Sequence, residues 1–150
     1  MNNQHIHIIN RGDKNIYASC QTVKARSNSE LLKKSLYRDY RGYIERKNVD
    51  GISFNIIETK KGCMRSGDIH KTTQFDMVLS GEIEVWALMK SITEKNIIKA
   101  NTLLIIEPHA PHLFIFLENT LMIEWWDGPF AAWYYKPYRD IINKHTKGRK

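Results

Sequence analysis

The sequence has little of several features that would assign a protein to a class at once. It contains only two cysteines, Cys20 and Cys63, in 150 residues, which argues against a disulfide framework and predicts a reducing compartment. No apolar run approaches the roughly 18 residues that a membrane-spanning helix needs. The first residues lack a basic stretch followed by an apolar one, so they do not read as a secretion signal. We therefore expect a cytoplasmic protein with no membrane partner.

The signatures of several common functional classes are also missing. There is no internal repeat, low-complexity tract, phosphate-binding loop, zinc-finger spacing or serine–histidine–aspartate set. The formal net charge of +7 would permit an acidic partner, but the basic residues are spread along the chain and part of the excess lies in residues 144–150. A basic tail of this kind is usually a solvated end, so we do not expect nucleic-acid binding.

What the sequence does contain is a series of short segments with strand patterns. Its length and composition fit one globular domain spanning residues 1–150. Turn residues separate the segments, and no crossover helix lies between them, which predicts an all-β antiparallel sandwich or barrel. The barrel core is expected at about residues 52–126. Alternating runs at residues 74–79 and 82–89 predict two of its strands. The other predicted strands are 52–58, 97–99, 103–106, 113–117 and 121–126.

The flanking segments carry weaker signals. Residues 5–9 alternate and predict a strand at a sheet edge. A serine followed three residues later by a glutamate has the capping-box spacing, which predicts a short N-terminal helix over 27–37. Residues 38–47 interleave basic residues with tyrosines, and a linking segment packed on the barrel wall is favoured over a surface for stacking bases. A proline at the first position predicts a short C-terminal helix over 137–144.

One predicted strand carries two different faces. Gln74 and Asp76 lie on one face, and Phe75, Met77 and Leu79 lie on the other. A face with Gln and Asp in mid-strand either meets water or lines a polar cavity, and the alternation alone favours water. The apolar face needs cover from another sheet, a helix or a partner chain, so we expect a homodimer.

Two motif-like stretches follow each other in the middle of the chain. The first runs Gly62, five residues, Asp68-x-His70, three residues, Gln74, six residues, Gly81. The second spans residues 101–112 and ends in a proline-rich loop and His112.

These spacings resemble the two motifs of the cupin superfamily, over about residues 52–126. His70 and His112 match family histidines, whereas Asp68 stands at a histidine position and Gln74 at a glutamate position. The resemblance implies a small antiparallel jelly-roll β-barrel with these side chains on its inside.

The resemblance also implies a metal site. Metal-binding cupins use three histidines and one glutamate, and the matching residues here are Asp68, His70, Gln74 and His112. Two imidazoles and a carboxylate suit a divalent transition metal such as Fe, Mn, Ni or Zn. The alternative is that the four residues form a polar, hydrogen-bonded pocket without an ion.

A second resemblance implies different chemistry. Arg65, His70 and Lys71 are similar to a motif of the dTDP-sugar 3,4-ketoisomerases, which are cupins. That similarity implies metal-free proton transfer on a nucleotide-linked sugar, as in sugar isomerases and epimerases. His70 would be the acid/base, Asp68 would orient it, and Arg65 or Lys71 would hold an anionic group.

A non-catalytic binding cupin remains a third possibility, because both motifs depart from the family pattern. Asp76 and Glu124 would line its pocket, and Trp125 or Trp126 would lie at the mouth or in the core. In all three cases the sequence predicts a polar barrel cavity that takes a small polar or anionic metabolite, with a carbohydrate as the leading candidate.

Overall fold

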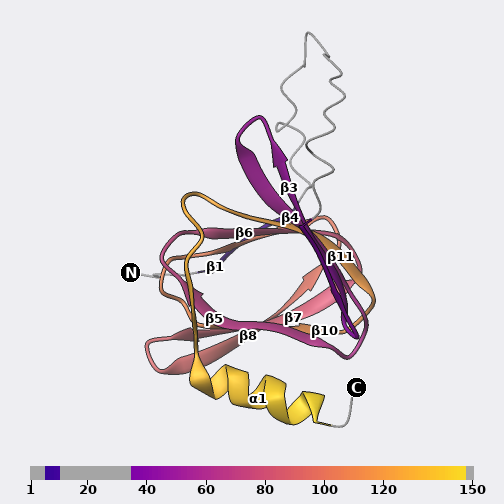
Figure 1. Cartoon of the computed structure of the whole chain (residues 1–150). Helices are drawn as coiled ribbons and strands as arrows, with labels where there is room; N and C mark the ends of the chain where they lie inside the picture. Colours follow the sequence, from indigo (N-terminus) through magenta and orange to yellow (C-terminus); the bar gives the residue numbers. More distant parts are fainter. Residues whose placement is uncertain (1–5, 11–34, 148–150) are drawn as a thin grey trace.

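The computed structural model describes residues 6–10 and 35–147, which form two antiparallel sheets and one helix. The first sheet has seven strands, which in spatial order are β1 (Ile6–Asn10), β9 (Thr102–Ile106), β6 (Gln74–Ser80), β11 (Thr120–Trp126), β4 (Ile52–Thr59), β3 (Gly42–Val49) and β2 (Ser35–Asp39). The second has five, in the order β12 (Ala132–Tyr134), β5 (Met64–His70), β10 (His112–Phe116), β7 (Glu82–Met89) and β8 (Ile92–Lys99). The sheets curve around a common interior (Figure 1), which confirms the predicted all-β antiparallel architecture.

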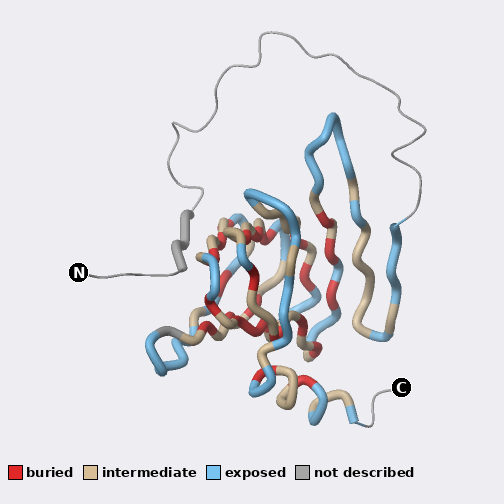
Figure 2. Tube along the Cα trace, turned by 60° about the vertical axis from the view of Figure 1, so that its left-hand side comes forward, coloured by how far each residue is buried: buried red, intermediate tan, exposed pale blue. Residues whose placement is uncertain are grey.

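The interior follows from period-two alternation along the strands. On β7, for example, Ile83, Val85 and Ala87 are fully buried, and the residues between them are not. Burial of such side chains between the sheets is the main stabilising contribution of the core. Figure 2 shows the same alternation of buried and less buried positions along the barrel strands. The core comprises Ile57, Val78, Ile83, Val85, Ala87, Ile98, Leu104, Ile106, Ala110, Phe114, Phe116 and Met122.

The polar face of β6 also lies inside. Gln74 and Asp76 are fully buried, and Phe75 and Met77 face outward and are half-buried. The polar interior is therefore correct, and the water-facing alternative that the alternation favoured is wrong.

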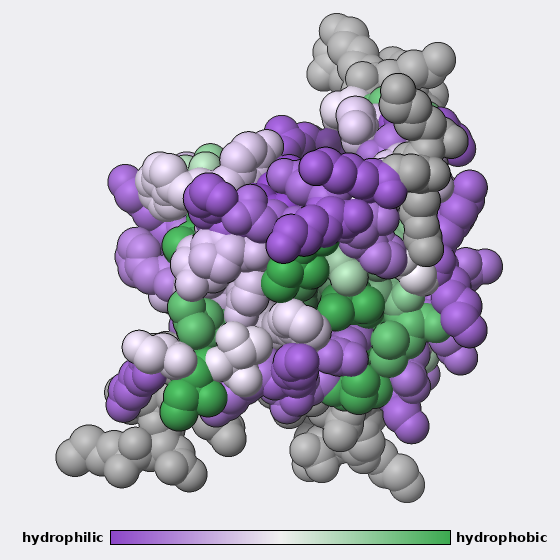
Figure 3. Space-filling view, turned by 90° about the horizontal axis from the view of Figure 1, so that it is seen from below, coloured by the Kyte–Doolittle hydropathy of each residue, from purple (hydrophilic) through white to green (hydrophobic). Residues whose placement is uncertain are grey.

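The helix α1 (Lys136–Thr146) covers the outer side of the second sheet (Figure 1). Its buried residues Tyr138 and Ile142 pack against Leu113 of β10 and Trp86 of β7. Pro137 lies in its first turn, where no backbone N–H is needed, which confirms the predicted C-terminal helix. Seen from this side, the surface mixes hydrophilic and hydrophobic residues (Figure 3).

Two predictions for the N-terminal region need correction. The segment expected to end a helix, residues 35–37, belongs to strand β2, and residues 27–34 lie outside the described residues. Residues 38–47 are not a linking segment but form most of the β2–β3 hairpin, with Tyr37 opposite Ile44. Pairing of β2 with β3 satisfies backbone groups of residues 35–37, which the capping-box pattern assigned to a helix. The predicted edge strand is confirmed, since β1 is the outermost strand of the first sheet beside β9.

No helix in residues 35–147 is long and apolar enough to cross a membrane.

Candidate metal and ligand site

A β-bulge in β5 determines which side chains reach the interior. His112 pairs with Asp68 and Leu113 with Ser66, so Gly67 is an extra residue on β5. Gly67 has φ +79°, in the left-handed region that favours glycine. Because of the extra residue, Arg65 and Asp68, three positions apart, both line the cavity together with His70.

Three potential metal ligands meet between β5 and β10. The Nε2 atoms of His70 and His112 each lie 3.5 Å from Oδ1 of Asp68. One ligand atom from each of these residues lies within 4.8 Å of the others. His70 and His112 are buried, and Asp68 is half-buried.

The orientation of His112 leaves a lone pair facing Asp68. Burial lowers the pKa of His112, which favours the neutral imidazole. Its Nδ1 lies 2.9 Å from the carbonyl oxygen of Ala110 and donates to it, so Nε2 carries the lone pair. Nε2 of His112 and Oδ1 of Asp68 are buried without a hydrogen-bond partner in the described part of the chain. Buried polar atoms are rarely left unsatisfied, so these two fit a cation between them.

Gln74 belongs to a neighbouring network of polar residues. Its amide nitrogen donates to Asp76 at 2.9 Å and to Glu124 at 3.2 Å, and Asn55 donates to Glu124 at 2.9 Å. Burial, followed by the charge of Glu124, raises the pKa of Asp76 well above its usual value. Burial also raises the pKa of Glu124 to about 7, although the hydrogen bond from Asn55 opposes the shift. The amide oxygen of Gln74 has no partner in the described residues, and its role as a fourth ligand stays a prediction.

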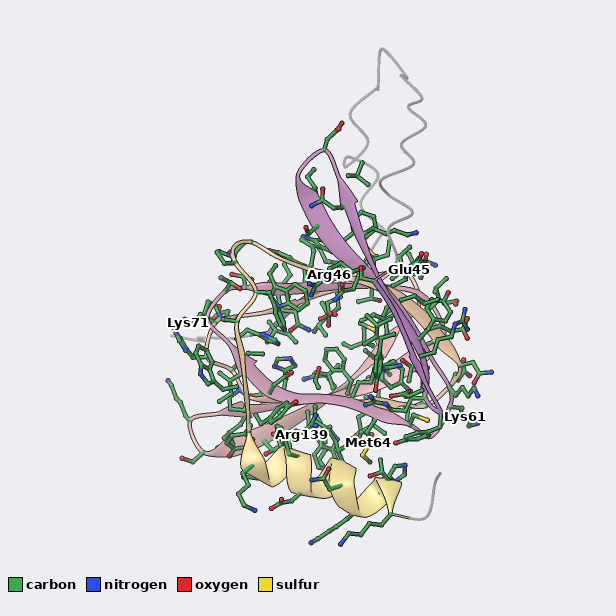
Figure 4. All side chains as sticks on the ribbon, viewed as in Figure 1. Glu45, Arg46, Lys61, Met64, Lys71 and Arg139 are labelled. Carbon is green, nitrogen blue, oxygen red and sulfur yellow. The ribbon has the colours of Figure 1, made fainter. Side chains whose placement is uncertain are left out.

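A cavity of about 570 Å³ opens beside the three ligands. Asp68, His70 and Glu124 form part of its wall, and four arginines form another part. Figure 4 labels two of them, Arg46 on β3 and Arg139 on α1. The four are Arg41, Arg46, Arg65 and Arg139.

These arginines differ in their partners. Arg41 forms an ion pair with Asp39 at 2.6 Å, and Arg139 donates to the Ser66 carbonyl at 2.9 Å. Arg65 is buried and donates to the Thr59 hydroxyl at 2.6 Å, but it forms no ion pair with a carboxylate in the described chain. Burial and the charge of Arg41 lower the pKa of Arg65.

The structure brings most of the predicted site residues together. Asp68, His70, Arg65 and Glu124 line the cavity; Gln74, Asp76 and His112 are buried in the strands around it. Lys71 is the exception.

Lys71 is exposed, and its ammonium group lies 5.2 Å from the ring of Trp133. In Figure 4 it points away from the barrel. Sequence reasoning missed Arg41, Arg46 and Arg139, because their convergence depends on strand pairing and helix docking. The basic and aromatic pattern of residues 38–47 was the available signal for the first two.

Comparison with known proteins finds similarity to solved structures and none to the sequences of curated proteins. No protein-family model and no curated protein matches the sequence. The structure is similar to an oxalate decarboxylase variant from B. subtilis, with TM-score 0.61 and 15% identity over 69% of this chain and 31% of that one. It is also similar to the Lactobacillus farciminis oxalate decarboxylase in complex with formate, with TM-score 0.60 and 16% identity over 79% of this chain and 39% of that one.

A third likeness is to the capsular polysaccharide assembling protein CapF from Staphylococcus aureus. It has TM-score 0.57 and 16% identity over 67% of this chain and 32% of that one. The chain thus spans about a third of the length of the solved structures it matches. The Bacillus subtilis oxalate decarboxylase contains Mn(II) centres. At these identities the likeness establishes the fold and leaves activity to be argued from the site.

Proposed function

We propose that this chain, which has the cupin fold, is a metal-dependent protein that binds a divalent transition metal through Asp68, His70 and His112. The observation that carries the proposal is the convergence of three ligand atoms within 4.8 Å. The two unsatisfied atoms in that group, Nε2 of His112 and Oδ1 of Asp68, support it.

The donor set indicates the kind of metal. Two imidazoles and one carboxylate leave coordination positions open and suit Fe(II) or a similar divalent ion such as Mn, Ni or Zn. A bound ion would supply Lewis-acid or redox chemistry to a molecule in the cavity. His112 would be held in its ligating orientation by the bond from Nδ1 to the Ala110 carbonyl.

The cavity wall favours a small anionic substrate. Arg65 is buried without a carboxylate partner in the described residues, and a buried charge ordinarily has one. A carboxylate or phosphate oxygen of the substrate would supply it, with a hydrogen bond assisted by both charges. Arg139, on the same wall, adds positive potential that favours an anion.

Metal binding is tested first on protein purified without an affinity tag. We expect a divalent transition metal near one equivalent, and Co(II) titration of the metal-free protein should give the visible spectrum of a bound ion. Replacing Asp68 by Asn or His112 by Ala should weaken Co(II) binding about 100-fold or more, since one of three ligands is lost.

Lys71→Met is the matched control, because Lys71 adjoins His70 in sequence but is exposed on the outside. It should bind Co(II) like the wild type. Equal binding by the wild type, Asp68→Asn and His112→Ala would place the ion elsewhere and refute the proposal.

A second candidate function is metal-free proton transfer on a carbohydrate, such as isomerisation or epimerisation of a nucleotide-linked sugar. The observation in its favour is Glu124, whose pKa of about 7 suits a general acid or base beside His70 in the same cavity. Asp68 would orient His70, and the exposed Lys71 would take no part. Turnover of a nucleotide-linked keto sugar by metal-free protein, abolished by Glu124→Gln, would favour this candidate. If the protein binds the nucleotide-linked keto sugar but does not convert it, a non-catalytic cupin is favoured.

A further inference from the structure

A second cavity, of about 540 Å³, adjoins the cavity beside Asp68 and His70, which we call the metal cavity. It lies between the tip of the β3–β4 hairpin and the segment that follows β11. Its wall shares four residues with the metal cavity, so the two spaces are neighbours with a common partition. The shared residues are Arg46, Asn55, Trp126 and Phe130.

Most of the wall of this second cavity, which we call the outer cavity, is apolar and aromatic. Its apolar lining comprises Ile52, Phe54, Trp125, Trp126, Pro129 and Phe130. Aromatic rings of this kind stack on planar groups with little need for hydrogen bonds.

Several polar groups of the outer cavity already form hydrogen bonds within the described part of the protein, and Arg46 does not use its guanidinium in this way. Ser53 accepts a hydrogen bond from Asn48 at 2.9 Å, and Asp127 accepts one from the Thr73 backbone at 3.0 Å. Asn55 donates to Glu124. Arg46 is exposed, and its guanidinium has no hydrogen-bond or ion-pair partner within the described chain. The outer cavity therefore offers aromatic surface and one uncommitted positive charge, Arg46, at the wall that it shares with the metal cavity, with Asp127 as the one acidic residue of its lining.

Trp126 adds an unused donor at the same partition. Its indole Nε1 is buried without a hydrogen-bond partner in the described residues. The Trp126 ring lies 5.5 Å from that of His70 and 4.6 Å from that of Phe130, measured between centroids. An anionic oxygen placed here would satisfy the indole N–H and pair with Arg46.

The geometry points to a substrate in two parts, a planar aromatic ring in the outer cavity and an acidic group that reaches through the partition toward Asp68 and His70. This inference rests on the proposed metal-dependent function and names its substrate class, an aromatic acid. A sugar ring would need several polar partners, whereas the wall of the outer cavity is mainly apolar and aromatic. A saturated acid would satisfy Arg46 but would make less favourable contact with the aromatic part of the lining.

Three probes of similar size test the inference by calorimetry on the full chain. They are 2-naphthoate, its uncharged analogue 2-naphthamide, and decahydronaphthalene-2-carboxylate, which is charged but saturated and not planar. We expect 2-naphthoate to bind about tenfold more tightly than either of the others, because only it uses both the rings and the charge. Equal affinities for all three, or no binding by any at millimolar concentration, would overturn the inference.

Two variants and a control locate the binding. Arg46→Met should weaken 2-naphthoate about tenfold and leave 2-naphthamide unchanged, because it removes the charge and keeps much of the chain length. Trp126→Phe should weaken 2-naphthoate by removing the indole N–H. Lys47→Met is the control, since Lys47 follows Arg46 on β3 but pairs with Glu45 and lines neither cavity. Equal losses in Arg46→Met and Lys47→Met would mean that only general electrostatics is at work.

Co(II) binding, titrated alone, separates this inference from the proposed function. Arg46→Met should bind Co(II) as the wild type does, because Arg46 is not a ligand. If the wild type binds 2-naphthoate selectively and fails to bind Co(II), the aromatic-acid site stands and the metal function fails. If it binds Co(II) and shows no preference for 2-naphthoate, the metal function stands and the aromatic-acid site fails.

Discussion

Gly67 is the residue that gives β5 its functional face. Strict alternation would put Arg65 and Asp68 on opposite sides of the sheet, because they are three positions apart. The bulge adds one residue, and both side chains then line the cavity beside His70. Gly67 also lies under α1, where an added Cβ would be 2.8 Å from Cδ of Arg139 and 2.9 Å from Cδ1 of Ile142. Gly67 therefore allows both the bulge that orients the site residues and the close packing of α1 on β5.

Replacing Gly67 by Ala should destabilise the protein by about 2–3 kcal/mol, from left-handed strain together with the crowding against α1. Gly51→Ala is the control, because Gly51 has a similar φ of +84° and nothing within 4 Å of an added Cβ. It should cost only about 1 kcal/mol. Urea unfolding of both variants measures the difference. Equal losses of unfolding free energy in the two variants would show that crowding against α1 does not add to the cost.

Glu124 makes stability depend on pH. Its pKa is about 7 in the folded protein against an ordinary 4.5, so the folded state binds more protons between these values. The free energy of unfolding should then fall as pH rises from about 4.5 to about 7, by on the order of 3 kcal/mol, and stay level above that range. Asp76 acts in the same direction, since burial raises its pKa too.

In metal-free protein, Glu124→Gln should flatten this slope and raise stability near neutral pH. Glu118→Gln is the control, because Glu118 is exposed. Melting temperatures at several pH values provide the measurement. A wild-type slope that persists in Glu124→Gln would assign the pH dependence to other groups.

At the scale of elements, the barrel strands, the N-terminal edge strand and the C-terminal helix could be predicted from the sequence, and the β2–β3 hairpin could not. The strand patterns of 52–58 and 121–126 and the proline of 137–144 are local signals, and each matches the structure. Residues 35–37 carry a helical signal but pair with β3, because tertiary pairing outweighs weak local propensity. Local sequence patterns do not predict which strands become neighbours in a sheet.

The same reason limits the prediction of the site. Asp68, His70 and His112 follow from motif spacing, and the structure brings them together. The inward direction of Gln74 and Asp76 depends on packing against the second sheet, so alternation alone favoured the wrong side. Arg139 reaches the cavity only because α1 docks beside Gly67. Each missed residue thus depends on a contact between segments distant in sequence.

At the scale of the whole molecule, the outer face of the first sheet is apolar across its central strands. Phe75 of β6 stacks on Trp125 of β11 at 5.3 Å between ring centroids, and Met77 pairs with Ile123. Leu79, at the end of β6, is 37% exposed. The side that carries α1 is covered by a mixture that includes many hydrophilic residues (Figure 3). A contiguous apolar surface of this kind ordinarily marks an interface.

A second copy of the chain is the partner we expect on this face. A stable dimer buries roughly 800 Å² on each partner, which a face several strands wide can provide. Light scattering at micromolar concentration should then give about twice the chain mass of 17.6 kDa. Met77→Lys should shift the mass toward that of a single chain, because a charge would be buried in the interface. Ile97→Lys is the control, since Ile97 is exposed on β8, the outermost strand of the other sheet. A wild-type mass of one chain at every concentration, or equal behaviour of the two variants, would exclude this face as a dimer interface.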